Sequence, residues 1–302
     1  MLFRSPANLG ISYHPRYVYS AMEVAGEVYI VAQSLAAATA EACGWTDARE
    51  IASFPGEKLG GTVFRHPFLE RNSVGILGEH VTLEQGTGAV HTAPGHGQED
   101  YVIGQVNGLA TYCPVDAAGR IFQAEGAPGT IPEELLGKSV WEANPIVIEI
   151  LKSKDALAGH RKIDHSYPHC WRCHKPTIFR ATDQWFIGME KHGLRQKALE
   201  AIKKVKWTPS WGEERISNMI ATRPDWCISR QRTWGVPITV FYCESCTEPL
   251  TDKAILDRVV ELFRTETADA WYTRTAAELV GDAKCKKCGG ASFRKEIGRA
   301  HV

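Results

Sequence analysis

The sequence lacks any long uninterrupted apolar run, and this absence argues against a membrane protein. Its longest apolar stretch, from Val28 to Ala40, is broken by Gln33 and Ser34. It is shorter than the roughly 20 residues that a helix needs to span a bilayer. The region near Met1 also lacks the charged-then-apolar layout of a signal peptide. We therefore expect no membrane partner and a cytoplasmic location.

Net charge is absent from the chain as a whole but not from its parts. The 302 residues carry 35 Lys and Arg against 35 Asp and Glu. Residues 1–151 hold 8 basic against 17 acidic side chains, residues 152–235 hold 17 against 8, and residues 236–302 hold 10 against 10. The basic middle segment is compatible with a phosphate backbone as partner, although such a segment is usually only a solvated face.

The chain has no internal repeat and no low-complexity segment, and its length suggests about two domains. Short strands with Gly and Pro between them predominate up to about residue 165, which predicts a compact α+β or barrel-like domain. Longer helices follow. We expect strands at residues 27–32, 48–54, 74–77 and 236–242, and helices at 34–43, 98–107, 143–153, 194–205, 212–221 and 253–265.

Two Cys-x-x-Cys pairs near the end of the chain indicate a metal site. Cys243 and Cys246 are separated by 38 residues from Cys285 and Cys288, and two glycines follow the second pair. Four thiolates complete the tetrahedral shell that zinc prefers in a closed structural site. Four unrelated buried cysteines would explain the matched spacing less well. We predict structural zinc here, with no ligand position open for catalysis.

A third pair, Cys170 and Cys173, has no second pair in the chain to meet. His165, His169 and His174 are close enough in sequence to complete a local metal site. A half site whose partners lie outside this chain is equally consistent with the pattern. Both interpretations stay open from the residues alone.

The segment from residue 86 to residue 101 reads Gly-Thr-Gly-Ala-Val-His-Thr-Ala-Pro-Gly-His-Gly-Gln-Glu-Asp-Tyr. Its glycines allow a backbone to approach a ligand closely. Its two acids fall in the first turn of a helix that begins at Gln98, where the helix dipole stabilises carboxylates. An ionised Asp100 would there hold a cationic amine. The alternative is a surface loop that caps a helix.

The same sixteen residues resemble the signature loop of the isoleucyl-tRNA synthetase editing domain. The related valyl and leucyl enzymes share the Gly-Thr-Gly-Ala-Val start but not the continuation. Residues 165–172, 179–186 and 223–238 are similarly close to this family, and the resemblance runs from about Pro6 to Glu296. The chain is therefore identified as an internal fragment of a class I isoleucyl-tRNA synthetase, with most of the editing domain and part of the catalytic body.

The resemblance implies an organisation of α+β and α/β parts. Residues 6–165 are expected to be a mixed, β-barrel-like editing domain that is truncated at its N-terminus. Residues 166–242 would return into a helical and Rossmann-type catalytic body, and residues 243–296 would be a small zinc-binding insertion. Residues 1–5 and 297–302 look like a translated sequencing adapter, so we expect both ends to be non-native.

The resemblance also assigns roles to single residues. Asp100 matches the aspartate that binds the amino group of the attached amino acid, and His91 matches the histidine that helps exclude the cognate isoleucyl group. Further contacts to the substrate are expected from Gly86, Thr87, Gly88, Thr92 and His96. The catalytic-body motif is expected at Ser229, Arg230, Gln231, Trp234 and Gly235.

The cysteine pairs have counterparts in the same family. Cys243, Cys246, Cys285 and Cys288 match a family zinc site, which agrees with their spacing. Cys170 and Cys173 match half of another site, whose partner pair lies upstream of the editing domain in sequence that this chain does not contain.

The function implied for the parent is that of an isoleucine–tRNA ligase that also deacylates Val-tRNA(Ile). Its partners would be isoleucine, ATP with Mg²⁺, and tRNA(Ile), above all the aminoacylated 3′ end, and the protein would be a monomer. The Thr-rich editing peptide and both ATP-binding signature motifs of the family are missing from the sequence. The fragment alone is therefore predicted to be inactive. The alternatives are a freestanding aminoacyl-tRNA deacylase and a non-catalytic zinc module that binds nucleic acid through residues 152–235.

Overall fold

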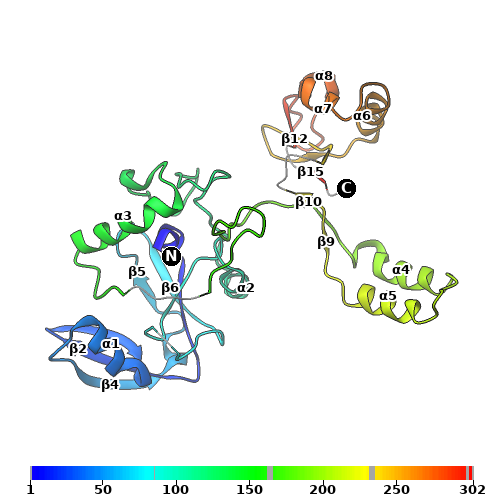
Figure 1. Ribbon diagram of the computed structural model, residues 1–302. Coiled ribbons are helices and arrows are strands. Elements are labelled where there is room, and N and C mark those ends of the chain that lie inside the picture. The colour runs from blue at the N-terminus through cyan, green and yellow to red at the C-terminus, as the bar shows by residue number, and fades with distance from the viewer. Residues whose placement is uncertain (1, 85, 162–165, 231–234, 297–298, 301–302) are drawn as a thin grey trace. The chain divides into compact units, whose positions relative to one another are not determined.

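Short strands and helices alternate along the whole described chain in the computed structural model (Figure 1). The structure describes residues 2–84, 86–161, 166–230, 235–296 and 299–300. The chain divides between Thr182 and Asp183 into two compact units. Several small sheets with interspersed helices confirm the α+β class. The division into units does not test the domain limits predicted at residues 165 and 242, which stay predictions.

A four-stranded sheet of mixed direction organises the first unit. Its central strand β1 (Gly10–Tyr13) runs parallel to β6 (Asn72–Leu77) and antiparallel to β7 (Val90–Thr92). β5 (Val63–Arg65) pairs with the other edge of β6. The sheet therefore brings together strands that are 80 residues apart in sequence, as the pairing of Ile11 with His91 shows.

An antiparallel sheet in the order β3-β2-β4 is the second element of this unit. β2 (Val18–Val24) and β3 (Glu27–Ala32) form a hairpin, and β4 (Arg49–Pro55) pairs with the other edge of β2. Both hairpin residues, Ala25 and Gly26, have positive φ, at 50° and 85°, as the tight turns that match strand twist require. The strands predicted at 27–32 and 48–54 are confirmed.

Three helices complete the first unit. α1 (Ala36–Cys43) follows β3 and ends at Gly44, whose φ of 68° is the left-handed conformation that commonly stops a helix. α2 (Gln98–Val106) and α3 (Val140–Ser153) lie close to their predicted ranges. The short 3₁₀ helices of this unit are η1 (Leu2–Ala7), η2 (Gln33–Leu35), η3 (Gly56–Leu59) and η4 (Glu133–Leu135).

α3 begins with a capping box. The Ser139 hydroxyl accepts a hydrogen bond from the backbone N–H of Glu142, whose carboxylate accepts one from the backbone N–H of Ser139. Such a cap contributes about 1 kcal/mol. One face of the helix is buried in the largest apolar core of the unit, which includes Phe3, Phe68, Ile121, Leu135, Val140, Ala143, Val147 and Leu151.

The second unit contains a helix pair followed by a small cysteine-bearing part. α4 (Leu194–Ile202) follows η5 (Lys191–Gly193) and packs against α5 (Gly212–Ala221). The Arg195 guanidinium donates to the carbonyls of Ala221 and Arg223 at 3.1 and 2.8 Å. These bonds satisfy carbonyls that the helix end leaves without partners. A short ladder joins β8 (Phe186–Ile187) to β9 (Trp226–Cys227).

The cysteine-bearing part is built on a three-stranded sheet in the order β13-β12-β14. These strands are β12 (Phe241–Cys243), β13 (Pro249–Leu250) and β14 (Phe293–Lys295), and the helices are α6 (Lys253–Glu266), α7 (Ala270–Thr273) and α8 (Ala276–Val280). Its core includes Phe241, Trp271 and Phe293 beside two of the cysteines. The helix predicted at 253–265 is therefore confirmed.

The single strand predicted at residues 236–242 is wrong. The chain forms β11 (Val236–Pro237), which pairs with β15 (Arg299–Ala300), and then moves to a different sheet at β12. β15 pairs on its other side with β10 (Ser229–Arg230). Pro237 explains the break, because proline has no N–H with which to continue a ladder. None of the helices in the described ranges combines the length and the apolar composition that crossing a bilayer requires.

Candidate functional site

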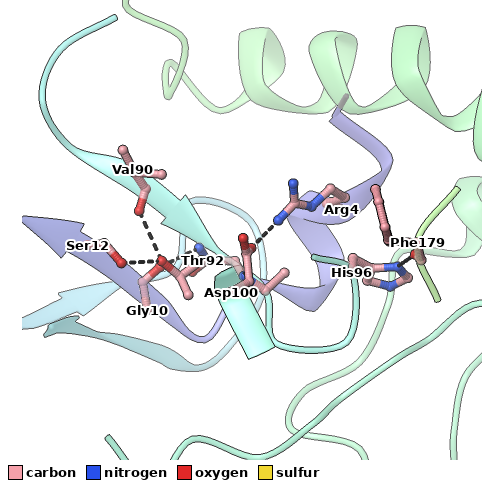
Figure 2. Close-up of polar contacts among 10 residues, drawn as sticks. Arg4, Gly10, Ser12, Val90, Thr92, His96, Asp100 and Phe179 are labelled. Carbon is pink, nitrogen blue, oxygen red and sulfur yellow. Dashed lines mark hydrogen bonds and ion pairs between the residues drawn. The ribbon is translucent and has the colours of Figure 1, made fainter. Parts of the chain in front are cut away.

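Asp100 lies in the first turn of α2, after a loop that returns from β7 (Figure 2). Its Oδ2 accepts a hydrogen bond from the backbone N–H of Ala93 at 2.7 Å and pairs with the guanidinium of Arg4. The Asp100 side chain is only 14% exposed. The carboxylate that the sequence predicted as an amine ligand is therefore already held by a cation from η1.

His91 stands on β7 opposite Ile11 of β1 and lines a cavity of about 280 Å³. The Nε2 atom of His91 is buried, with no hydrogen-bond partner among the described residues. The cavity walls are largely apolar and include Ile11, Phe64, Phe68, Ala89 and Leu151. A space of this size and lining has room for a small aliphatic group, with the imidazole at one wall.

Three histidines around this region are uncharged near neutral pH. Burial lowers the pKa of His66, His91 and His96 to about 4 in each case. Nδ1 of His66 accepts from the backbone N–H of Leu69 at 3.1 Å, so its Nε2 donates to the carbonyl of Ser5 at 3.0 Å. Nδ1 of His96 lies 3.0 Å from the carbonyl of Phe179 and must donate to it (Figure 2).

These histidines are expected to make the first unit sensitive to acid. Their folded-state pKa of about 4 lies below the ordinary 6.5, so the unfolded chain takes up their protons first. Stability should be fully present above pH 6.5 and should fall as pH drops toward 4, by on the order of 3 kcal/mol for each fully buried histidine. Urea unfolding at several pH values measures this loss.

Two histidine variants separate this effect from general acid unfolding. His66→Gln should reduce the loss of stability between pH 6.5 and 4, because Gln does not titrate. His192 is exposed, and His192→Gln is the control for the loss of a histidine outside the buried group. An identical pH profile in the His66 variant would contradict the assignment.

The glycine-rich start of the loop packs against the second sheet. The carbonyl of Thr87 accepts from the backbone N–H of Ala32 at 2.7 Å, and the carbonyl of Gly88 accepts from the hydroxyl of Tyr19 at 2.7 Å. Gly88 has a φ of 74°, and a Cβ there would lie 2.5 Å from the Cβ of Ala32. Only glycine fits such an approach.

The residues predicted to contact substrate do not all meet at one cavity. Gly86 and Thr87 line a second space of about 370 Å³ beside α1. Thr92 is 1% exposed, and its hydroxyl lies 2.6 Å from the hydroxyl of Ser12 (Figure 2). His96 is 2% exposed. His91 lines one cavity, to whose lining Asp100 does not belong, whereas Gly86 and Thr87 face a separate space.

The four predicted zinc ligands converge. Cys243 Sγ lies 3.5 Å from Cys288 Sγ, and Cys246 Sγ lies 3.6 Å from Cys285 Sγ. All four sulfur atoms lie within 4.8 Å of one another. Tetrahedral zinc with bonds of about 2.3 Å needs similar sulfur separations. Hydrogen bonds from the backbone N–H groups of Cys288 and Lys287 lower the pKa of Cys285, which favours the thiolate. The cluster fits a metal ion.

Cys170 and Cys173 form a separate turn in the first unit. The backbone N–H of His174 donates to the carbonyl of Cys170 at 2.8 Å. Within the described ranges, this pair belongs to no group of three or more residues placed to hold a metal. His165, one of the candidate local ligands, lies outside the described residues.

The catalytic-body motif is described only in part. The Ser229 hydroxyl accepts from the backbone N–H of Trp185 at 2.6 Å, and Arg230 donates to the carbonyl of Cys227 at 2.8 Å. These bonds lie within the second unit. Gly235 directly precedes β11. The predicted positions Gln231 and Trp234 lie outside the described residues.

Sequence reasoning missed several residues of this site. Arg4 stood in a segment predicted to be non-native, so it received no role. His66 and Phe64 carry no local pattern that marks them as cavity walls. Only the pairing of strands from distant parts of the chain brings them to His91.

The chain is similar to one protein family and to several curated proteins. The family described as tRNA synthetases class I (I, L, M and V) matches residues 14–296. The isoleucine–tRNA ligase of Syntrophomonas wolfei is 51% identical over 292 residues, with 96% of this chain and 30% of the relative covered. The isoleucine–tRNA ligase of Geobacter sulfurreducens is 51% identical over 293 residues, with 97% and 31% covered. The chain thus spans about a third of the length of these relatives.

Among solved structures, the chain is similar to one titled "The crystal structure of GlLeuRS-CP1". The TM-score is 0.41 and the identity 15%, with 51% of this chain and 78% of that chain covered.

Proposed function

We propose, from the premise that this chain belongs to the class I tRNA synthetases (I, L, M and V), that its first unit carries the editing pocket of an isoleucine–tRNA ligase. The parent would attach isoleucine to tRNA(Ile) with ATP and Mg²⁺. The pocket would hydrolyse Val-tRNA(Ile). The relatives named as isoleucine–tRNA ligases, at 51% identity, support this choice of amino acid.

The observation that carries the proposal is the short loop of residues 93–97, which joins β7, where His91 lies, to the first turn of α2, where Asp100 lies. β7 ends at Thr92, the residue after His91. The loop that follows begins with Ala93, whose backbone N–H donates a hydrogen bond to the Asp100 carboxylate. The carboxylate would hold the α-ammonium of an attached amino acid, while the side chain would enter the cavity of about 280 Å³ that His91 bounds. A cavity wall at His91 would then limit the length of the accepted side chain.

A second pocket is needed because one binding site discriminates poorly between isoleucine and valine. Valine lacks one methylene of isoleucine, and a hydrophobic synthetic site gains only about 1–3 kcal/mol from that group, a limit for which this pair of amino acids is the standard illustration. A second pocket that admits valine and excludes isoleucine sterically supplies the remaining discrimination.

The chemistry is the hydrolysis of an ester. A water oxygen attacks the acyl carbon, the bond to the ribose oxygen breaks, and the ribose oxygen takes up the proton that the water gives up, so that valine and the free ribose hydroxyl are the products. Asp100 would act by positioning the acyl group, which raises the effective concentration of the reacting groups. His91 is neutral at pH 7, because burial lowers its pKa to about 4, so it would form a wall and a hydrogen-bonding surface.

The finer assignments extend the same proposal. Residues 6–165 would be the barrel-like editing domain, residues 166–242 the return into the Rossmann-type body with the Ser229 to Gly235 motif, and residues 243–296 the zinc-binding insertion. Zinc would be held by the four converging cysteines, and Cys170 with Cys173 would be half of a further site. The parent would be a cytoplasmic monomer whose RNA ligand is the 3′ end of tRNA(Ile).

Incubation with Val-tRNA(Ile) tests the assignment. The full-length parent should release valine and should leave Ile-tRNA(Ile) intact. Release of isoleucine at the same rate would refute the proposed pocket. Rapid release by the 302-residue chain alone would instead indicate a freestanding deacylase, and binding without release by the parent would indicate a non-catalytic RNA module.

A further inference from the structure

The loop of residues 93–97 is hydrogen-bonded to a much later segment of the chain, residues 179–181. The backbone N–H of Ala181 donates to the carbonyl of Gly95 at 2.8 Å. Nδ1 of His96 donates to the carbonyl of Phe179 at 3.0 Å (Figure 2). The two residues of the second bond are 83 positions apart in sequence, so the contact belongs to the tertiary structure of the first unit.

A third part of the chain packs closely against the same loop. A Cβ at Gly95 would lie 2.2 Å from the carbonyl oxygen of Tyr112, so only glycine fits the approach of the two backbones. The later segment is bonded to this part as well, because Nε of Arg180 donates to the carbonyl of Val115 at 2.7 Å. The loop is thus held by two parts of the chain that are also bonded to each other.

The His96 side chain is placed for this contact. The residue is only 2% exposed, and its Nε2 atom is buried with no hydrogen-bond partner among the described residues. The ring is neutral, because burial lowers its pKa to about 4. With the proton on Nδ1, Nε2 carries none. Such burial favours a role within the framework of the pocket over a direct contact with substrate.

The loop transmits the position of His96 to the candidate pocket. The backbone N–H of His96 donates to the carbonyl of Ala93 at 2.8 Å. The backbone N–H of Ala93 in turn donates to the Asp100 carboxylate at 2.7 Å. A displacement of His96 therefore moves Ala93, and with it the hydrogen bond that orients Asp100.

We propose that His96 is a positioning residue of the editing pocket, which keeps the loop of residues 93–97, through its bond to Phe179, in the form in which Ala93 binds Asp100. The effect on deacylation rests on the proposed function, whereas the contact itself does not. The framework of the pocket then extends beyond the domain limit predicted at residue 165, because residues 179–181 follow that limit.

The protonation of the His96 ring tests the contact without any variant. The bond to a carbonyl requires the proton on Nδ1, and nitrogen NMR shifts distinguish the two neutral tautomers of histidine. We expect His96 of the 302-residue chain to carry its proton on Nδ1 at neutral pH. A proton on Nε2 or a charged ring would overturn the proposal. This measurement is decisive even where a variant fails to fold.

Two variants at this position test the effect on the loop. His96→Asn keeps an N–H donor near the place of Nδ1, whereas His96→Leu removes it. Hydrogen exchange of the Ala93 and Ala181 backbone amides should be about tenfold faster in His96→Leu, the effect of one lost hydrogen bond, and close to normal in His96→Asn. The Ile121 amide, which donates to the carbonyl of Lys138 in the core of the same unit, is the internal control and should be unchanged.

The exchange rates also define results that contradict the proposal. Exchange at Ala93 that is unchanged in His96→Leu would refute the role of His96. Exchange that is accelerated equally at Ala93 and Ile121 would show a general loss of stability, and it would refute the role as well. The same holds if His96→Asn loosens the loop as much as His96→Leu does.

Deacylation of Val-tRNA(Ile) by the full-length parent gives the functional readout. In His96→Leu, kcat should fall about tenfold with KM little changed, because the contacts with RNA remain and only the positioning of the reacting group is impaired. His96→Asn should restore most of the rate. A normal kcat in His96→Leu would refute the inference alone. A parent that does not deacylate Val-tRNA(Ile), although the tautomer and the exchange rates are as expected, would refute the proposed function alone.

Discussion

Asp100→Asn in the full-length parent is expected to slow deacylation of Val-tRNA(Ile) by roughly 100-fold, and activation of isoleucine should continue unchanged. The substitution keeps an oxygen that can accept from the N–H of Ala93 and removes the negative charge that would hold the α-ammonium. Loss of one member of a desolvated charge pair costs about 2–5 kcal/mol, which corresponds to a factor of this size. Release of valine and isoleucine-dependent pyrophosphate exchange measure the two activities.

Glu99→Gln is the matched control for this substitution. Glu99 lies beside Asp100 in the first turn of α2, and its side chain is exposed. Glu99 experiences the same helix dipole as Asp100, but its side chain faces solvent. Deacylation at the normal rate in the Asp100 variant, or an equal loss in the Glu99 variant, would refute the assigned role of Asp100.

Removal of metal is expected to unfold the cysteine-bearing part of the second unit before the rest of the chain. Four cysteine side chains whose sulfur atoms lie within 4.8 Å of one another lose the metal–sulfur bonds that would hold them together once the cation is gone. Apparent binding energies of structural zinc are about 10–16 kcal/mol, which is comparable to the whole free energy of unfolding of a typical domain, about 5–15 kcal/mol. Chelation should therefore remove the protection of backbone amides against hydrogen exchange first at residues 236–296, as exchange measured with and without chelator would show.

Cysteine variants make the metal test specific. Cys285→Ser should lower the bound zinc measured by elemental analysis and should expose residues 236–296 as chelation does. Cys227 lies outside the four-sulfur group, so Cys227→Ser should retain the zinc. Melting that is identical with and without chelator would contradict a structural metal at this cluster.

Local patterns in the sequence predicted the elements that depend on local interactions. The helix at 212–221 and the strand at 27–32 agree with the structure residue by residue, because their start and stop signals lie within a few residues. The strand at 236–242 failed, because its division depends on which distant strands pair with β11 and β12. The cysteine cluster was predictable, since two matched Cys-x-x-Cys pairs in one segment are typical of tetrahedral thiolate sites.

The candidate pocket was predictable only in part, because some of its contacts join residues that are far apart in sequence. The position of Asp100 at a helix start follows from residues 97–100, and the structure places it there. Its ion pair with Arg4 joins residues 96 positions apart, and no local pattern specifies such a contact. The cavity walls at Phe64 and His66 come from another strand of the sheet and the turn after it.

The hydroxyl pair between Ser12 and Thr92 has a consequence for the selectivity of this pocket. It lies on the β1 and β7 ladder, in which His91 pairs with Ile11. A slip of this ladder by one residue would turn His91 to the opposite face of the sheet and bring a neighbour to the cavity. The contact between the Ser12 and Thr92 hydroxyls therefore helps to fix the register in which β1 and β7 pair. A change in either hydroxyl is therefore expected to impair the proposed side-chain selectivity even where His91 itself is unchanged.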